Sequence, residues 1–309
     1  MTGRRARPDR ATDGAPAPSI VVVGSLNMDL IVRSSHLPAS GETLLGSSFS
    51  TLPGGKGANQ AIAAARAGGR VRMVGAVGSD DFGAELTGAL DGTGVDTRLV
   101  RRVAGSSGVA LITVDDAAEN TIVVVAGANA AMTTLDEADR AVIADADLLM
   151  LQLEIPLDTV TAAALVAAAA GVPVLLNPSP VRALPAELLA AVDILVVNEI
   201  EAAALGDARS AGGHLVTTLG AAGARYLGPD GTVAQAAPPR VSAVDTTGAG
   251  DAFTGALAVA WSRGDDPATA LRWACAAGAL ATTVPGAGAA APMAADINRI
   301  LAPGGPASW

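Results

Sequence analysis

Aromatic residues are scarce in this chain of 309 residues, at 2% of the composition, although half of all residues are hydrophobic. The apolar half therefore consists mainly of Ala, Val and Leu. With only 16% charged residues as well, the chain lacks the low hydrophobicity and high charge density of disordered proteins. Its length allows one large α/β domain with an appendage, or roughly two domains of ~150 residues.

Cysteine and histidine are also rare. Cys275 is the only cysteine, and the two histidines, His36 and His214, are far apart in the sequence. One cysteine cannot form a disulfide within the chain, and this composition argues against a cysteine-based zinc site. It is typical of a reducing compartment, so we expect a cytoplasmic protein.

Positive charge is in deficit, with 20 Lys and Arg against 30 Asp and Glu, a formal net charge of −10. This balance argues against nucleic acid or an anionic membrane as a partner. The uncharged stretches Thr159–Leu176 and Ala274–Ala295 are interrupted by glycine and proline, whereas a spanning helix needs ~20 strongly apolar residues. Residues 1–19 are basic without a following apolar run, so we expect a disordered leader there.

Strand-like and helix-like periodicities alternate along most of the chain. Ile20–Val23 is a short β-branched run, which is typical of a strand buried on both faces. This alternation predicts a doubly wound, mainly parallel sheet with helices on both faces, formed by a domain over residues 20–309. The further expected strands are Val71–Val77, Leu148–Leu153, Pro173–Leu176, Ile194–Val197, Leu215–Leu219 and the hairpin Ala224–Leu227 with Thr232–Gln235. The expected helices are Lys56–Ala67, Asp80–Leu90, one opened by a capping box of Thr134 and Glu137, Leu157–Ala170, Leu184–Ala191, one from Glu199, Ala249–Ser262, Pro267–Thr283 and Ala294–Leu301.

Four further strands have no helices between them. They are Asp29–Val32, Thr43–Phe49, Gly108–Val114 and Thr121–Val125. We expect them to form a small antiparallel sheet that projects as a lid, contributed by about residues 29–50 and 107–126. Because only one face of such a sheet can close on a ligand, the other could pair with a second copy, which predicts a homodimer.

The segment Val244–Gly255 contains the strongest functional pattern. A glycine-rich turn enters a helix, whose first N–H groups have no partners within the helix and favour an anion. Asp251 lies at this helix start and could simply complement the helix dipole. Beside a phosphate site, however, a carboxylate makes sense as a base that takes a proton from a hydroxyl attacking the phosphate.

A second glycine turn, Gly54–Gln60, also enters a helix. It indicates a polar-substrate site with Lys56 and Asn59 as donors, although an ordinary loop with a solvated lysine would look the same. Asn27 and Asp29 follow the first strand at its carboxyl end, where α/β sheets bind ligands. Residues two apart in an extended segment project to the same side, so this pair could hold adjacent hydroxyl groups.

Other patterns are rejected. The sequence contains no Walker A motif, and Gly286–Ala291 matches the dinucleotide fingerprint only superficially, because it follows a helix and has no acidic residue about 20 positions later. Cys275 lies in an Ala-rich stretch without a neighbouring base, which favours a packing role.

Together, these motifs and their order resemble the ribokinase family of sugar and nucleoside kinases, the PfkB-type carbohydrate kinases, from about Ile20 to Leu301. Gly54–Gln60 resembles the N-terminal signature of the family and Asp245–Gly255 its C-terminal signature. Five further segments resemble those of ribokinases: Gly24–Asp29, Ala126–Ala130, Leu149–Glu154, Leu176–Pro180 and Asn198–Glu201.

The resemblance implies an ATP-dependent kinase that phosphorylates D-ribose at its 5-hydroxyl. Asp251 would be the general base, and the amides of Gly248, Ala249 and Gly250 would stabilise the transferring group. The implied sugar-binding residues are Asn27, Asp29, Gly55, Lys56, Gly57, Ala58, Asn59, Glu154 and Asp251. Those implied for ATP are Asn198, Thr218, Leu219, Gly220, Ala221, Ala222, Gly223, Gly250, Asp251 and Cys275.

Two cations are implied as well. Glu201 would help to place Mg²⁺ through water, because Mg²⁺ keeps part of its hydration shell. An activating K⁺ ion would be bound by Asp245, Thr247, Ala281, Val284, Gly286 and Ala290. The sequence departs from the family where Ala290 replaces a frequent serine, Cys275 replaces a frequent histidine, and Ala221-Ala222 lacks polar side chains.

Three alternatives differ in what they require. A nucleoside kinase of the same family needs a wide apolar pocket for a base, and Phe49 is the only aromatic residue in the expected lid region. A non-catalytic sugar sensor predicts loss of the base or of the anion cradle, and both are present. An NAD-linked dehydrogenase lacks its fingerprint context.

Overall fold

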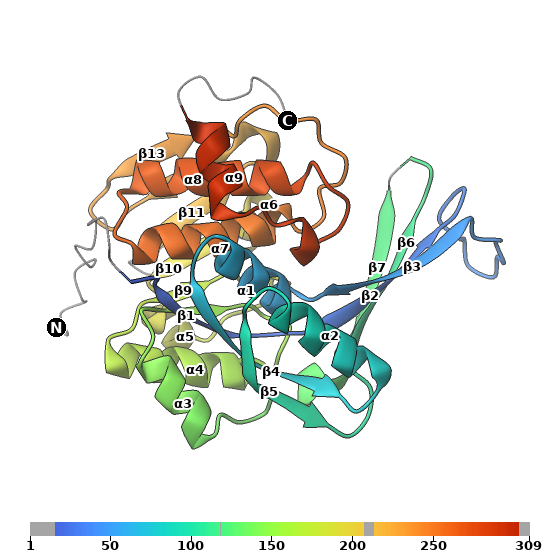
Figure 1. Ribbon diagram of the computed structural model, residues 1–309, viewed down its shortest axis with the longest axis horizontal. Coiled ribbons are helices and arrows are strands. Elements are labelled where there is room, and N and C mark those ends of the chain that lie inside the picture. The colour runs from blue at the N-terminus through green and yellow to red at the C-terminus, as the bar shows by residue number, and fades with distance from the viewer. Residues whose placement is uncertain (1–15, 118, 207–212, 303–309) are drawn as a thin grey trace.

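The computed structural model describes residues 16–117, 119–206 and 213–302, and they form a large sheet flanked by helices and a small projecting sheet (Figure 1). The strand order of the large sheet is β13-β12-β11-β10-β9-β8-β1-β4-β5. All neighbours are parallel from β11 to β5, whereas β11, β12 and β13 pair antiparallel. The strands are β1 (Ser19–Val23), β4 (Arg70–Gly78), β5 (Asp96–Val103), β8 (Leu148–Leu151), β9 (Val174–Leu176), β10 (Ile194–Asn198), β11 (His214–Thr218), β12 (Ala224–Leu227) and β13 (Val233–Ala236).

The first strand lies inside the sheet, between β4 and β8. The chain therefore builds the sheet outward from β1 in two directions, and the order of strands reverses beside it. Ligands of such sheets bind outside the carboxyl ends of the strands at this reversal. The loops after Val23, Leu151 and Leu176 consequently lie where a site is expected.

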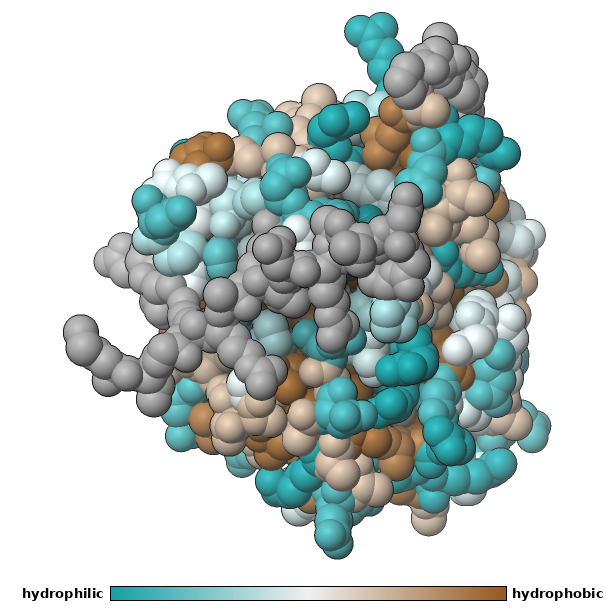
Figure 2. Space-filling model, turned by 60° about the vertical axis from the view of Figure 1, so that its left-hand side comes forward, coloured by the Kyte–Doolittle hydropathy of each residue, from teal (hydrophilic) through white to brown (hydrophobic). Residues whose placement is uncertain are grey.

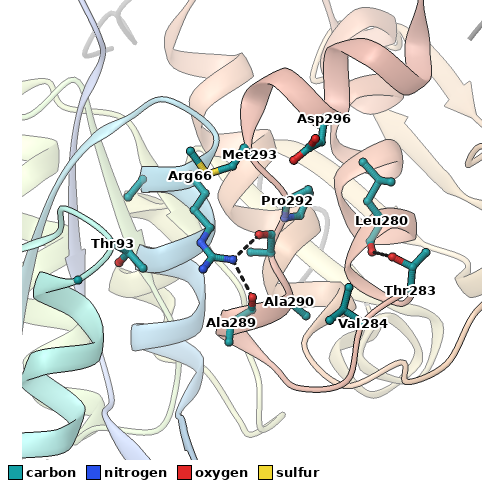
Figure 3. Close-up of a pocket in the computed structure, with 13 residues that line it drawn as sticks. Arg66, Thr93, Leu280, Thr283, Val284, Ala289, Ala290, Pro292, Met293 and Asp296 are labelled. Atoms are coloured by element: carbon teal, nitrogen blue, oxygen red, sulfur yellow. Dashed lines mark hydrogen bonds between the residues drawn. The ribbon is translucent and has the colours of Figure 1, made fainter. Parts of the chain in front are cut away.

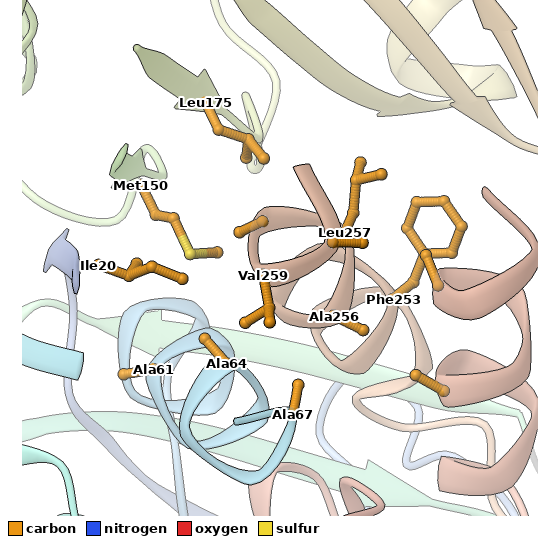
Figure 4. Close-up of a cluster of buried hydrophobic side chains, with 14 of the residues drawn as sticks. Ile20, Ala61, Ala64, Ala67, Met150, Leu175, Phe253, Ala256, Leu257 and Val259 are labelled. Atoms are coloured by element: carbon orange, nitrogen blue, oxygen red, sulfur yellow. The ribbon is translucent and has the colours of Figure 1, made fainter. Parts of the chain in front are cut away.

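Helices cover both faces, as the sequence predicts. Two separate hydrophobic clusters result, one with α1, α2, α7, α8 and α9 and the other with α3, α4, α5 and α6. Figure 4 shows part of the first, where alanines of α1 meet Ala256, Leu257 and Val259 of α7. The helices are α1 (Lys56–Arg66), α2 (Asp81–Asp91), α3 (Glu137–Ala144), α4 (Leu157–Ala170), α5 (Ala186–Ala191), α6 (Glu199–Leu205), α7 (Ala249–Ser262), α8 (Pro267–Ala281) and α9 (Ala294–Leu301).

The small sheet has the order β3-β2-β6-β7 and projects from the main body (Figure 1). Its strands are β2 (Asn27–Arg33), β3 (Ser48–Gly54), β6 (Gly108–Val114) and β7 (Asn120–Val125). The predicted small sheet is confirmed, with antiparallel pairs β2–β3 and β6–β7, but the central pair β2–β6 is parallel. Since β2 follows β1 and β3 leads into α1, the base of this lid lies at the carboxyl end of the main sheet.

Several local predictions are wrong. The lid strand expected at Thr43–Phe49 lies at Ser48–Gly54; it includes Pro53, which is tolerated because β3 is an edge strand. The capping box of α3 is formed by Asp136 and Asp139 rather than by Thr134 and Glu137. Strand β5 escaped prediction because three arginines interrupt its apolar pattern at the edge of the sheet.

The described part of the chain begins at residue 16, shortly before β1. Ser19, the last residue of the predicted leader, is the first residue of β1, and residues 1–15 lie outside the described residues. Within the part of the chain that the structure describes, no helix is long and apolar enough to cross a membrane. On the face in Figure 2, hydrophilic and hydrophobic side chains are intermixed.

Candidate active site

Helices α1 and α7 lie against each other at the carboxyl end of the main sheet. Gly255 makes this approach possible, because a Cβ atom there would lie 2.6 Å from Ala63 Cβ and 2.7 Å from Ala64 N. Small residues thus bring the first turns of the two helices together. Both glycine signatures of the sequence, which are almost 200 positions apart, meet at this contact.

Asp251 lies in the first turn of α7 and faces α1. Its side chain is 8% exposed. Oδ2 accepts a hydrogen bond from Asn59 Nδ2 at 3.2 Å, and Oδ1 accepts one from Gln60 Nε2 at 2.9 Å. One donor on each oxygen fixes the plane of the carboxylate.

The turn before α7 presents backbone to open space. Gly248 has a φ of 75°, and a Cβ atom there would lie 2.7 Å from Ala287 Cα, so the position requires glycine. A Cβ atom on Gly250 would meet nothing within 4 Å. The first-turn N–H groups therefore border free volume beside Asp251, as an anion site requires.

Glu154 connects three segments on the sugar side of the predicted site. Its Oε2 atom accepts hydrogen bonds from Ser25 Oγ at 2.5 Å, Lys56 N at 3.0 Å and Asn27 Nδ2 at 3.4 Å. Asn27 is held further by Asn129, whose Nδ2 donates to Asn27 Oδ1 at 2.7 Å. The end of β1, the start of β2 and the start of α1 are thus fixed to one another.

Asp29 and Lys56 add two charges to this region. Burial, together with the negative charges of Glu154 and Asp251, raises the pKa of Asp29 to about 7. Lys56 is the only lysine of the chain. Burial lowers the pKa of its ammonium group, but the carboxylates of Asp251, Glu154 and Glu201 outweigh burial and raise it overall. A positive charge therefore persists among the carboxylates.

A cavity of about 560 Å³ opens on the other side of Asp251, between the turn after β11, α7 and α8. Six residues predicted to bind the nucleotide line it: Thr218, Gly220, Ala221, Gly223, Gly250 and Cys275. Its size falls in the range of small-molecule sites. The other four residues predicted for the nucleotide are not in its lining: Asn198, Leu219, Ala222 and Asp251.

Cys275 is a wall residue of this cavity. It is buried, and its Sγ atom lies 3.5 Å from Ala236 O as a donor. Burial raises the pKa of its thiol to about 12, so it stays protonated near neutral pH. The residue can contact a ligand by packing, but it is no nucleophile.

Asn198 and Glu201 share a capping box at the start of α6. Asn198 Oδ1 accepts from Glu201 N at 2.8 Å, and Glu201 Oε2 accepts from Asn198 N at 2.9 Å. Nowhere in residues 16–117, 119–206 and 213–302 do three or more His, Cys, Asp or Glu side chains gather as a metal site would need. A metal near Glu201 would therefore depend on water and on phosphate oxygens.

Asp245 links two of the other residues predicted to bind K⁺. Its Oδ1 accepts from Thr247 N at 2.9 Å and its Oδ2 from Gly286 N at 3.1 Å, which joins the turn before α7 to the loop after α8. Figure 3 shows how Arg66 of α1 holds the same loop by donating to Ala289 O and Ala291 O, both at 2.7 Å. The loop also contacts Asn59, which donates to Asp251, since Gly288 N donates to Asn59 Oδ1 at 3.1 Å.

Sequence reasoning missed several side chains of the site. Gln60, Gln152 and Asn177 form hydrogen bonds around Asp251, and Ser25 and Asn129 support Glu154 and Asn27. A usable signal exists, because Ser25, Gln152 and Asn177 follow the ends of β1, β8 and β9, which are neighbours in the sheet. A polar residue after each buried parallel strand marks the edge where ligands bind.

Comparison with known proteins decides the family. The model of the pfkB family carbohydrate kinases matches residues 17–294. The chain belongs to this family. Ribokinase of Bacillus subtilis is 39% identical over 297 residues, which cover 92% of this chain and 99% of the relative. The structure of Arabidopsis thaliana ribokinase complexed with ribose and ATP superposes with a TM-score of 0.86 at 34% identity, covering 92% of this chain and 99% of the other.

The predicted fold and the predicted class of enzyme, a kinase similar to ribokinases, are thereby confirmed. The relatives are not uniform in substrate, since a deoxyribokinase of Salmonella typhi is 35% identical over 302 residues, covering 91% of this chain and 98% of the relative. Membership alone therefore leaves the choice among sugars to the residues of the site.

Proposed function

We propose that this chain transfers the γ-phosphoryl group of ATP to the 5-hydroxyl of D-ribose, giving D-ribose 5-phosphate and ADP. The position of Asp251 carries the proposal. It is buried, hydrogen-bonded at both oxygens, next to the open turn at Gly250 and electrostatically coupled to Asp29 and Lys56. It therefore separates a polar pocket from a nucleotide-sized cavity.

Asp251 acts as the general base. It takes the proton from the 5-hydroxyl as the oxygen attacks the phosphorus atom, and the bond from phosphorus to the leaving oxygen of ADP breaks. The amides of Gly248, Ala249 and Gly250 stabilise the charge on the transferring group. Because they are already oriented by the start of α7, no reorganisation is needed during the reaction.

The sugar lies among Asn27, Asp29, Glu154 and the turn at the start of α1. In β2, Asn27 and Asp29 point to the same side, so together they offer a donor and an acceptor for adjacent hydroxyl groups. The turn formed by Gly55, Lys56, Gly57, Ala58 and Asn59 borders the rest of the ring, where the ammonium group of Lys56 supplies donors, because the main-chain N–H groups of residues 56–59 already donate within the protein. A pair of adjacent hydroxyls fits ribose better than 2-deoxyribose, which lacks one of them.

The nucleotide occupies the cavity lined by Gly220, Ala221 and Cys275, with Asn198, Leu219 and Ala222 at its margin. The residues fit MgATP: Glu201 would hold Mg²⁺ through water, and the ion would supply positive charge to the phosphates. They also fit K⁺ in part, since Asp245 supplies a carboxylate and the loop after α8 supplies backbone carbonyls, whereas Ala290 supplies no side-chain oxygen.

We also propose that the outer face of the lid forms a homodimer. Because residues paired across neighbouring strands point to the same side, the pairs Val32–Phe49, Leu111–Val123 and Val109–Val125 lie on the face opposite Asp29. Phe49 is 64% and Val123 61% exposed. Such a hydrophobic face favours association. Sedimentation that shows only monomer at micromolar concentration would refute this assignment.

The main experiment is a coupled ADP-release assay over ribose, 2-deoxyribose, fructose, adenosine and inosine, with and without K⁺. We expect the highest kcat/KM with ribose and a higher rate with K⁺. A nucleoside preferred to every free sugar would overturn the substrate assignment. No turnover with any of the five, although ribose binds, would instead support a sugar sensor.

A further inference from the structure

The carboxamide of Gln60 is committed in full to the surroundings of Asp251. The residue is 0% exposed. Its Nε2 atom donates to Asp251 Oδ1 at 2.9 Å and to Asn177 Oδ1 at 3.1 Å, which uses both of its protons. Its Oε1 atom accepts from Gln152 Nε2 at 2.6 Å. Both donors of Gln60 are therefore used within the protein, and neither is left for a sugar or a nucleotide.

The orientation of Gln60 follows from the charge of its neighbour. An ionised carboxylate only accepts hydrogen bonds, so the nitrogen of Gln60 must face Asp251. The oxygen of Gln60 then faces Gln152, which must present its own nitrogen in turn. If Gln60 were rotated, two oxygen atoms would face each other beside Asp251.

In this arrangement one buried oxygen atom of Gln152 has no hydrogen-bond partner among the described residues. The residue is 0% exposed, and the atom is its acceptor Oε1. A buried acceptor without a partner lowers the folding free energy that the protein gains, because it loses its hydrogen bond to water on folding. The chain has only three glutamines, Gln60, Gln152 and Gln235, and two of them form this costly contact. A structural role alone would be served better by an apolar pair.

We infer that Gln60 is a positioning residue for the base, and that Gln152 holds Gln60 in the orientation that donates to Asp251. The inference rests on the proposed role of Asp251. Asn59 fixes one oxygen of the carboxylate and Gln60 the other, so the plane of the base is set by two consecutive residues of α1. Neutral amides do this without adding charge to a pocket that already contains Asp29, Glu154 and Asp251.

The first test is Gln60→Met, which keeps the length of the side chain and removes the donor. We expect kcat to fall about 30- to 100-fold, while KM for the sugar stays within threefold. Because one donor that fixes the plane of the carboxylate is lost, the pH profile of kcat should differ in shape from that of the parent. A merely structural role would leave the shape of the profile unchanged.

The second test is Gln152→Met alone and combined with Gln60→Met. Since Gln152 acts through Gln60, we expect a loss of about tenfold alone and no further loss in the double variant. The Tm of Gln152→Met should change little, because the substitution removes one unpartnered buried oxygen, that of Gln152, and leaves another, that of Gln60. Independent, multiplying losses would refute the coupling of the two glutamines.

Gln235→Met on exposed β13 is the matched control and should retain parental kcat. All variants are assayed with whichever sugar the parent phosphorylates fastest. If that sugar is not ribose, the substrate assignment fails and the positioning test still stands. If the parent turns over and Gln60→Met equals it in kcat and pH profile, the inference about Gln60 fails alone.

Discussion

The two sides of the candidate site contain different kinds of residues. The side with Asp251, Asp29 and Glu154 consists of charged and carboxamide side chains that are buried and hydrogen-bonded to one another. Of the 17 described residues that line the cavity proposed for the nucleotide, eight are glycine or alanine, and Arg240 is the only charged one. We therefore expect side chains to set the chemistry and the choice of sugar on one side, and the shape of the cavity to contribute more to recognition on the other.

This difference predicts how each side responds to substitution. On the side-chain side, removing one group leaves buried partners without a hydrogen bond, which is costly. On the cavity side, the glycines and alanines leave little side chain to truncate. A substitution that adds volume is therefore the change that we expect to weaken nucleotide binding there. The following predictions test this contrast, from the largest effect to the smallest.

Asp251→Asn should abolish most of the activity. We expect kcat to fall by about 10³-fold, because an amide cannot accept the proton and general-base catalysis is worth roughly 10²–10⁴. KM for ribose should change little, since Asn keeps the shape of the residue. Turnover within a few-fold of the parent in steady-state assays would remove Asp251 as the base.

Glu154→Ala should weaken sugar binding. The substitution leaves Ser25 Oγ, Lys56 N and Asn27 Nδ2 without their shared acceptor. We expect KM for ribose to rise about 100-fold, with KM for ATP within threefold. An equal rise in both constants would show that the two sides of the site are not independent.

Gly250→Ala tests the cavity by adding volume. The new methyl group meets no protein atom, so folding should be unaffected, but it enters the space in front of α7. We expect KM for ATP to rise about tenfold with KM for ribose unchanged. The matched control is Gly88→Ala on exposed α2, which also meets no protein atom and should leave both constants unchanged.

Asp29→Asn should change the pH dependence of stability. A carboxyl group whose folded pKa is raised from 3.8 to about 7 binds its proton more tightly in the folded state. The contribution of Asp29 to the free energy of unfolding is therefore fully present below pH ~4 and is lost as the pH rises through about 7. We expect the Tm of Asp29→Asn to exceed that of the parent by a few degrees at pH 8 and to match it at pH 4. Identical differences at both pH values in thermal scans would contradict this effect.

Much of this molecule could be predicted from the sequence, and the failures have physical reasons. Helices α4, α7 and α9 lie at the predicted residues, because apolar periodicity marks all three and a glycine bounds α4 and α7. Strand β5 was missed because pairing at the sheet edge, rather than its own pattern, makes it a strand. The motifs located Asp251, Asn59 and Glu154.

The sequence could not show how these side chains pair. Asn59 was predicted as a sugar donor, yet in the structure it donates to Asp251, and Gln60 beside it was given no role. Such contacts depend on how closely α1 approaches α7. Gly255 permits this close approach, but no local sequence pattern predicts it.

Equilibrium binding of ATP to Asp251→Asn, measured by titration calorimetry with Mg²⁺ present, tests most directly whether chemistry and nucleotide recognition are separable. The account predicts a Kd equal to or lower than that of the parent, because removing a negative charge beside the phosphates removes a repulsion. A Kd more than tenfold higher would contradict it, because the carboxylate would then be part of nucleotide recognition itself.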